Sequence, residues 1–183
     1  MFNRIIAALL LLLLAPIFIV VSLFIFFEDG FPIFFTQKRV GASSTFFNIY
    51  KFRSMKKETP NVATHLLENP AQYLLKIGGL IRRLSIDELP NIINILRGEM
   101  LFVGPRPALY NQDDLMRLRE QAGVGQLIPG ITGWAQINGR DEISLEEKVQ
   151  YEKEYLERKS FWFDVKIVVF TFVKVLNSKG VQH

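Results

Sequence analysis

The sequence predicts an α+β fold: a compact, mostly helical domain with one short β-hairpin, joined to an N-terminal segment that enters a membrane. The chain has 183 residues, enough for one domain with its own core. Residues 5–27 are apolar and uncharged, and a second apolar stretch lies near the C-terminus. Between them lie two alternating segments and several segments with apolar residues at helical spacing. We therefore expect residues 1–30 to be embedded in the membrane and residues 31–183 to form a domain continuous with them.

The apolar N-terminal run is long enough for a membrane helix, because a rise of about 1.5 Å per residue carries it across a hydrocarbon core of about 30 Å. A cleavable signal peptide is disfavoured, since the run is long and no A-x-A site precedes Glu28. Pro16 lies in its middle, where proline kinks or breaks a helix. Arg4 precedes the run, and Lys38 and Arg39 follow it. Because positive charge stays on the cytoplasmic side, we expect a re-entrant helix-break-helix at the cytoplasmic face, with a single span as the alternative.

The C-terminal stretch, residues 160–180, is the second candidate for membrane contact. Helical spacing gathers its polar residues, among them Asp164 and Thr171, into one narrow stripe, and aromatic and aliphatic residues occupy most of the rest. Two interpretations remain open: a buried core helix, or an amphipathic helix lying in the membrane interface.

Composition narrows the chemistry. The chain contains no cysteine, which excludes disulfides and thiolate metal sites. Its two histidines, His65 and His183, are far apart, so a histidine-rich zinc site is not expected. The formal net charge of +4 favours an anionic partner such as phosphate or anionic lipid. No pattern of a DNA- or RNA-reading module is present, and we expect no nucleic-acid partner.

Alternation predicts two strands, within residues 31–41 and 45–55, joined by a turn at 41–44. Lys51 and Arg53 lie on the second strand, where they form either a solvated face or a basic wall toward phosphate. Helices are expected at residues 72–84, 111–123 and 144–160, the last opening with a capping box of Ser144 and Glu147.

The segment "RRLSIDELPNIINILRGEM" contains an adjacent acidic pair, Asp87 and Glu88, before an amphipathic helix that ends near residue 98. Ser85 and Glu88 fit a capping box, but that start would put Pro90 at the fifth helical position, where it costs stability. A helix that begins with Asp87 as its N-cap places Pro90 in the first turn instead. The acidic pair is then either a capped helix start or part of a phosphate site.

Positive charge lies on both sides of this pair. Arg82 precedes it, and Arg106 follows it between two prolines that fix the backbone and leave the guanidinium little freedom to lose. Arginine suits bidentate phosphate recognition, and Mg²⁺ typically takes one or two carboxylates together with phosphate oxygens. A metal–phosphate site and a capped helix followed by a turn both remain possible from the residues alone.

Four segments, "IYKFRSM", "RRLSIDELPNIINILRGEM", "FVGPRP" and "PGITGWAQINGR", resemble in order and spacing the bacterial sugar transferases known as monotopic phosphoglycosyl transferases. The resemblance covers nearly the whole chain and is closest to the small enzymes that initiate capsule and O-antigen assembly. It implies transfer of a sugar 1-phosphate from a UDP-sugar to undecaprenyl phosphate with release of UMP, at the cytoplasmic face of the bacterial inner membrane. The resemblance does not specify the sugar or the oligomeric state.

The resemblance also implies roles for residues. Asp87 would be the nucleophile that forms a phospho-sugar intermediate, and Glu88 would bind Mg²⁺, with Asp87 as a second ligand. The expected phosphate-binding residues are Arg82, Arg106, Lys51 and Arg53. The expected contacts to the nucleotide-sugar are Gln136, Asn138 and Arg140, unless their segment is only a structural turn around Trp134. The family's break is usually Ser-Pro, whereas this chain has Ala15-Pro16.

Two other functions would also suit the residues. A membrane-bound glycosyltransferase would release UDP, although neither a D-x-D motif nor a Rossmann glycine fingerprint is present. A non-enzymatic scaffold would bind anionic lipid, but acidic residues beside Arg106 argue against such a surface.

Overall fold

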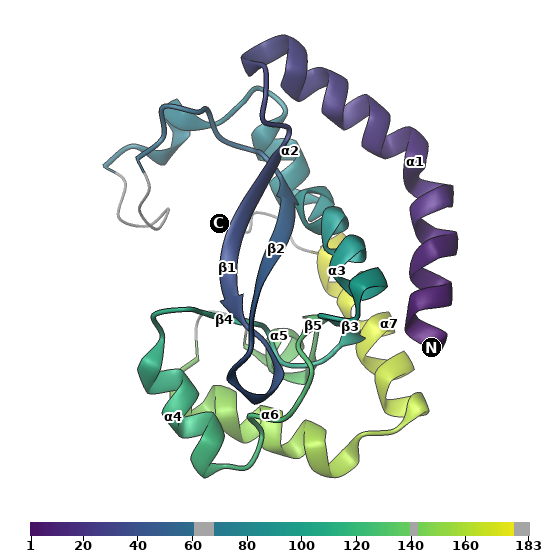
Figure 1. The fold of residues 1–183 in the computed structure, drawn as a ribbon, viewed down its shortest axis with the longest axis vertical. Helices are drawn as coiled ribbons and strands as arrows, with labels where there is room; N and C mark the ends of the chain where they lie inside the picture. The colour runs from purple at the N-terminus through teal and green to yellow at the C-terminus, as the bar shows by residue number, and fades with distance from the viewer. Residues whose placement is uncertain (61–67, 140–142, 178–183) are drawn as a thin grey trace.

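The computed structural model describes residues 1–60, 68–139 and 143–177 (Figure 1). Helix α1 (Phe2–Asp29) runs along one side of the molecule and changes direction part-way along its length. By length and composition α1 is able to cross a membrane, and only 11% of its most apolar stretch is buried. The helix continues through Pro16, so the structure contains one bent helix and does not confirm a break. The re-entrant arrangement stays a prediction.

The predicted hairpin is confirmed. Strands β1 (Phe34–Val40) and β2 (Phe46–Phe52) pair antiparallel, with Phe34 opposite Phe52, and a 3₁₀ turn η1 (Ala42–Ser44) joins them. Strand β4 (Ala108–Leu109) pairs antiparallel with β1, giving the strand order β2-β1-β4. A second, parallel pair consists of β3 (Leu101–Val103) and β5 (Gly130–Thr132).

Asn94 joins the hairpin to helix α3 (Ile92–Arg97). It is fully buried, its Oδ1 accepts a hydrogen bond from the Tyr50 backbone N–H at 3.3 Å, and its Nδ2 donates to the Asn48 carbonyl at 2.7 Å. The amide thus satisfies backbone groups on the edge of β2 that would otherwise lack partners. This contact holds the second strand, and the lysine on it, beside the acidic segment that precedes α3.

The remaining helices partly follow the sequence pattern. Helices α4 (Asp113–Gln121) and α6 (Leu145–Arg158) lie where amphipathic spacing predicted them, and the capping box of α6 forms. Helix α2 (Gly78–Arg83) is shorter than predicted, because Leu74 pairs with Met55 in a β-bridge and precedes the helix. The other elements are the 3₁₀ turn η3 (Pro70–Tyr73), α5 (Trp134–Asn138) and α7 (Phe161–Asn177).

Helix α1 contributes to the hydrophobic core at both of its ends. Ala7 is fully buried against α3, in a cluster that includes Ile92 and Ile95. Val21 and Ile25 belong to a second cluster, which contains residues of β2 and α2. A third cluster joins α4, α6 and α7. The N-terminal helix therefore packs against the rest of the protein along one face and leaves the other face exposed.

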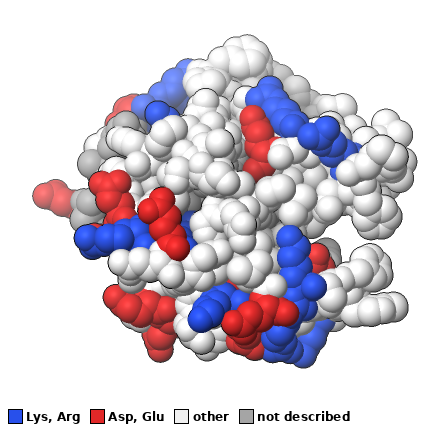
Figure 2. Space-filling model, turned by 60° about the horizontal axis from the view of Figure 1, so that its bottom comes forward, with Lys and Arg blue, Asp and Glu red and all other residues white. Residues whose placement is uncertain are grey.

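Helix α7 turns a face that includes a polar residue toward the domain and a mostly apolar face outward. Phe163 and Ile167 are buried against the domain, and the polar Asp164 faces it too, since it accepts a hydrogen bond from the Tyr155 hydroxyl at 2.9 Å. The outward face is mostly apolar and includes Phe161, Trp162, Val165, Val169, Phe170, Phe172 and Val173, together with the exposed Lys166 and Lys174. Figure 2 shows charged side chains at the left, in the upper centre and along the lower part of one face of the molecule, with a mostly uncharged right-hand edge. A fully buried core helix is therefore the wrong interpretation of this segment.

Candidate functional site

The acidic pair lies in a 3₁₀ helix, η4 (Ile86–Asn91), that follows a left-handed Ser85 with φ of 55°. Neither predicted start of the helix is observed: Ser85 makes no side-chain cap, and the α-helix proper begins only at Ile92. Pro90 is the physical reason, because a proline without an N–H is poorly tolerated inside an α-helix and here precedes it. The tight turn places Asp87 and Glu88 at the wall of a cavity.

Glu88 is held by two cations from distant parts of the chain. The Nζ of Lys51, on β2, lies 2.7 Å from Glu88 Oε1, and an Nη of Arg106 lies 3.5 Å from the same oxygen. Burial opposes ionisation of Glu88, but Lys51 and then Arg106 outweigh it and lower the pKa from 4.5 to about 2. Glu88 is therefore ionised at neutral pH and joins three separate segments of the chain.

Asp87 is in a different electrostatic environment. Burial raises the pKa of its carboxyl from 3.8 to about 6; the neighbouring Glu88 adds to this effect, and Lys51 and Arg82 partly offset it. Within the described residues Asp87 forms no ion pair. The two adjacent carboxylates, which both line the cavity, therefore differ: Glu88 is ion-paired with two cations, and Asp87 is the more basic of the two.

The backbone around Arg106 is fixed at three consecutive carbonyls. The Pro105 carbonyl accepts from the Gly130 N–H at 2.9 Å, and the Pro107 carbonyl accepts from an Nη of Arg39 at 3.1 Å. The Arg106 carbonyl itself accepts from an Nη of Arg119 at 2.9 Å. Because the two prolines also fix φ, the Arg106 side chain leaves a rigid loop and reaches toward Glu88.

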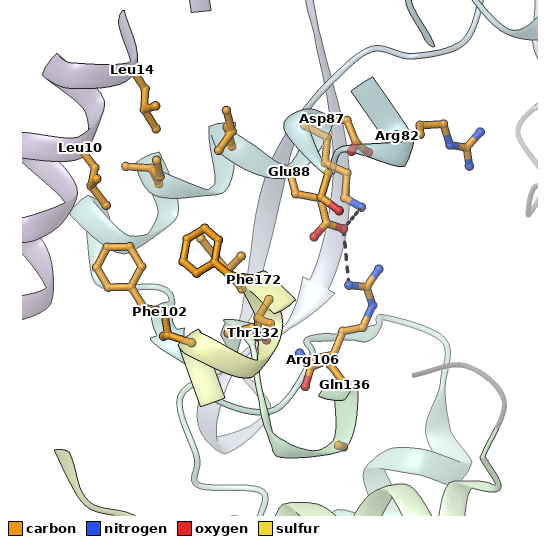
Figure 3. Close-up of a pocket in the computed structure, with 18 of the residues that line it drawn as sticks. Leu10, Leu14, Arg82, Asp87, Glu88, Phe102, Arg106, Thr132, Gln136 and Phe172 are labelled. Carbon is orange, nitrogen blue, oxygen red and sulfur yellow. Dashed lines mark hydrogen bonds and ion pairs between the residues drawn. The ribbon is translucent and has the colours of Figure 1, made fainter. Parts of the chain in front are cut away.

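The cavity has a volume of about 550 Å³ and two chemically different ends (Figure 3). One end is lined by the charged residues Lys51, Arg82, Asp87, Glu88 and Arg106. In Figure 3 the guanidinium of Arg82 points away from the acidic pair. The other end is lined by the apolar residues Leu10, Leu14, Phe102, Ile131, Val168 and Phe172, from α1, α7 and the β3–β5 sheet. Its shape and polarity suit a ligand with an anionic group and an apolar chain.

The predicted nucleotide-sugar residues are separated by the structure. Gln136 lines the cavity, and both polar atoms of its amide are buried without a hydrogen-bond partner among the described residues. Such an amide is costly unless a ligand or water satisfies it. Asn138 is exposed, donates to the Trp134 carbonyl at 2.8 Å and does not line the cavity. Arg140 lies outside the described residues.

Arg53 is the one predicted phosphate ligand that the structure places elsewhere. It is 7% exposed, forms an ion pair with Asp29 and donates to the Gly30 carbonyl at 2.7 Å, at the end of α1. Alternation suggested that Arg53 would share a face with Lys51, but Arg53 lies one residue beyond β2, where its backbone N–H donates to the Ile33 carbonyl at 2.9 Å and its side chain pairs with Asp29. Arg53 thus holds the end of the apolar helix to the domain.

Sequence reasoning missed the apolar wall of the cavity and a buried ion pair near it. Leu10 and Phe172 each lie in an apolar run in which every residue carries the same signal, so pattern alone could not select them. Arg119 and Glu152 form a buried ion pair between α4 and α6, in helices that read as solvent-exposed surface helices. The sequence signal that could have revealed this ion pair is a charged residue on the apolar face of each helix, Arg119 in α4 and Glu152 in α6.

The acidic pair offers the type of donor that a magnesium site completed by a substrate phosphate would use. Its carboxylates are the oxygen donors that Mg²⁺ prefers, and the described residues contain no group of three or more acidic, histidine or cysteine side chains. Mg²⁺ usually keeps waters and binds through one or two carboxylates plus phosphate oxygens. Asp87 and Glu88 therefore fit a cation held jointly with a phosphate.

Taken together, the fold and the site define a protein with an apolar N-terminal helix that is long enough to cross a membrane and a cavity lined by both charged and apolar residues. The comparisons with known proteins are more specific. A family model described as bacterial sugar transferase matches residues 1–178. The chain belongs to this family, as its motifs predicted.

Relatives of known sequence agree with this assignment. The uncharacterized sugar transferase EpsL of Bacillus subtilis is 46% identical over 84% of this chain and 75% of its own length. The UDP-glucose:undecaprenyl-phosphate glucose-1-phosphate transferase of Escherichia coli is 39% identical over 97% of this chain but only 40% of its own length. The exopolysaccharide production protein ExoY of Rhizobium meliloti is 34% identical over 98% of this chain and 85% of its own length.

Proposed function

We propose that this protein transfers a sugar 1-phosphate from a UDP-sugar to undecaprenyl phosphate at the cytoplasmic face of the bacterial inner membrane, and so begins assembly of a surface polysaccharide. The single observation that carries the proposal is the cavity with two ends, in which a carboxylate pair with basic residues faces an apolar wall built partly by α1. Relatives whose names specify glucose-1-phosphate transfer to undecaprenyl phosphate support the same reaction.

The polar end supplies what phosphoryl transfer needs. Arg106 leaves a loop fixed at three carbonyls, so its charge is pre-positioned for phosphate oxygens. Lys51 and Arg82 add positive charge at the same end. Mg²⁺ held by Asp87 and Glu88 would neutralise charge on the phosphoryl oxygens.

The apolar end suits the acceptor. Leu10 and Leu14 of α1 and Val168 and Phe172 of α7 offer an apolar surface to the first isoprene units of a polyprenyl phosphate. The exposed apolar faces of α1 and α7 allow the rest of the lipid chain to stay in the membrane. The lipid phosphate would then lie toward Asp87.

Asp87 is the proposed nucleophile. Its carboxylate oxygen attacks the sugar-bearing phosphorus, a new O–P bond forms, and the bond to the UMP oxygen breaks, with UMP taking the electron pair. An oxygen of the lipid phosphate then attacks the same phosphorus and releases the carboxylate, which gives undecaprenyl diphosphate-sugar. Two steps through one residue allow a soluble donor and a lipid acceptor to use one site in turn. Glu88, already bound by two cations, is less suited to attack.

The proposed binding site for the UDP-sugar donor lies around Gln136. Its amide has an unsatisfied donor and an unsatisfied acceptor next to the polar end, as recognition of a uracil edge or a sugar hydroxyl requires. UDP-glucose is the first donor to test, because four of the relatives carry glucose in their names.

The test is intact-protein mass spectrometry of the detergent-solubilised protein with Mg²⁺ and a panel of UDP-sugars, without lipid. A mass increase of one sugar phosphate is expected, and it should be absent in Asp87→Asn. Asp114→Asn is the matched control, because Asp114 is an exposed carboxylate on α4 outside the cavity.

Three other outcomes would contradict the proposal in different ways. Turnover with lipid but without an adduct would make Asp87 a metal ligand in direct transfer. Release of UDP would identify a glycosyltransferase. Failure to release UMP or UDP with any donor and undecaprenyl phosphate would favour a lipid-binding scaffold.

A further inference from the structure

A buried ion pair outside the reacting groups contacts the loop that carries Arg106. Arg119, on α4, is 5% exposed, and Glu152, on α6, is 2% exposed. The Nε of Arg119 donates to Glu152 Oε2 at 2.8 Å, and an Nη donates to Oε1, so the contact is bidentate. The same Nη also donates to the carbonyl of Arg106 at 2.9 Å.

We propose that Arg119, held by Glu152, is a positioning residue that fixes the backbone of Arg106 and thereby the place of its guanidinium in the cavity. The catalytic part of this inference rests on the proposed function. The geometry supports a role beyond joining two helices, because an arginine that only paired with Glu152 would not need to reach the Pro-Arg-Pro loop. Both oxygens of Glu152 accept from Arg119, so Glu152 is engaged as its partner although it lines the cavity.

The Pro-Arg-Pro tripeptide lies between two paired segments: the Gly104 N–H donates to the Thr132 carbonyl at 2.9 Å, and β4 pairs with β1. Pro105 and Pro107 have no N–H, so the tripeptide donates at most one backbone hydrogen bond and is fixed mainly through its carbonyls. Neighbouring carbonyls accept from Gly130 and Arg39, and the central one accepts from Arg119. Loss of the Arg119 contact therefore releases the residue whose side chain reaches Glu88.

A buried ion pair allows a sharp test, because it can be replaced as a pair. Replacement of both charges with apolar residues of similar volume often leaves stability unchanged or raises it, whereas removal of one partner is strongly destabilising. Arg119→Met/Glu152→Met should therefore retain the wild-type Tm within a few degrees. It nevertheless lacks the donor to the Arg106 carbonyl.

The first readout does not depend on activity. Hydrogen–deuterium exchange of the segment 104–110 should be faster in the double-methionine variant than in the wild type, with exchange in α4 and α6 unchanged. The second readout is UMP release, for which we expect a fall in kcat/KM of about 10- to 100-fold, the size of effect that follows from misplacement by about 1 Å.

A double-mutant cycle separates this role from a direct role of Glu152 in the cavity. In an Arg106→Met background, the two methionine substitutions should cause little further loss, because the residue that they position is gone. Arg119→Lys provides a second variant: it keeps a charge for Glu152 but lacks the fork, and it should stay folded with faster exchange at 104–110 and reduced turnover.

Each result decides the inference. Wild-type exchange at 104–110 in a folded double-methionine variant would overturn it, as would a full further loss of activity in the Arg106→Met background. If the double variant does not fold, wild-type exchange and turnover in Arg119→Lys would overturn it instead. Absence of UMP release by the wild-type protein would refute the proposed function, and exchange at 104–110 would still decide whether Arg119 holds the loop.

Discussion

Lys51→Met tests how much the ion pair between Lys51 and Glu88 stabilises the folded protein. The Lys51–Glu88 contact is 2.7 Å long, and the two side chains are only 19% and 22% exposed, so water screens them weakly. The fall of the Glu88 pKa from 4.5 to about 2 corresponds to about 3 kcal/mol at 1.36 kcal/mol per pH unit, which is what Lys51 and Arg106 together contribute beyond the opposing effect of burial. Lys51 is the larger contributor, and we assign it about 2 kcal/mol.

The expected result is a lower Tm by about 4–8 °C in detergent, because about 1 kcal/mol shifts the Tm of a protein of this size by roughly 2–4 °C. The measurement is thermal unfolding in EDTA, so that no divalent cation compensates. Lys153→Met, at an exposed position on α6, is the matched control and should leave the Tm nearly unchanged. Addition of Glu88→Gln should remove most of the effect of Lys51→Met. An unchanged Tm in Lys51→Met would show that this contact contributes no stability and that the reasoning is wrong.

Three further predictions concern the scaffold. Burial raises the pKa of Asp164, so the ionised carboxylate destabilises the folded state at neutral pH. Asp164→Asn, whose amide oxygen still accepts a hydrogen bond from the Tyr155 hydroxyl, should therefore be at least as stable as the wild type at pH 7. As the pH falls through the pKa of Asp164, the wild type should gain stability relative to this variant, as measured by denaturation at several pH values. Gly104→Ala would place a Cβ 2.4 Å from a backbone oxygen, and we expect loss of the folded protein, read from yield and size exclusion. Ile167→Ala should cost about 2–5 kcal/mol in urea unfolding, whereas Val169→Ala, on the exposed face, should cost little.

Local patterns predicted the elements whose signals are local. The hairpin, α4 and α6 follow from alternation, helical spacing and a capping box, all of which depend on neighbours in sequence. The start of α3 could not be predicted in the same way. The two candidate N-caps, Ser85 and Asp87, are only two residues apart, and the structure has a 3₁₀ helix there before α3 begins at Ile92. The shortening of α2 depends on a bridge from Leu74 to Met55, which the helical pattern does not contain.

The polar end of the cavity could be predicted further than the apolar end. The sequence alone draws attention to an adjacent acidic pair, Asp87 and Glu88, and to an arginine between two prolines, Arg106. The structure brings these residues together with Lys51. Leu10 and Phe172 come from opposite ends of the chain, so only the three-dimensional fold identifies them as lining residues. Arg53 shows the converse: its position in the sequence resembles that of Lys51, but its side-chain contacts lie at the end of α1.

The contribution of α1 to the cavity affects how the chain can be engineered. Because Leu10 and Leu14 form part of the wall, deletion of the N-terminal helix to make a fragment without the apolar segment would also remove one side of the cavity. An unrelated hydrophobic helix in its place would keep the apolar character of the N-terminus and leave the cavity open on that side. A fusion protein would therefore have to preserve the particular residues of α1 that face the cavity, and not only its hydrophobicity.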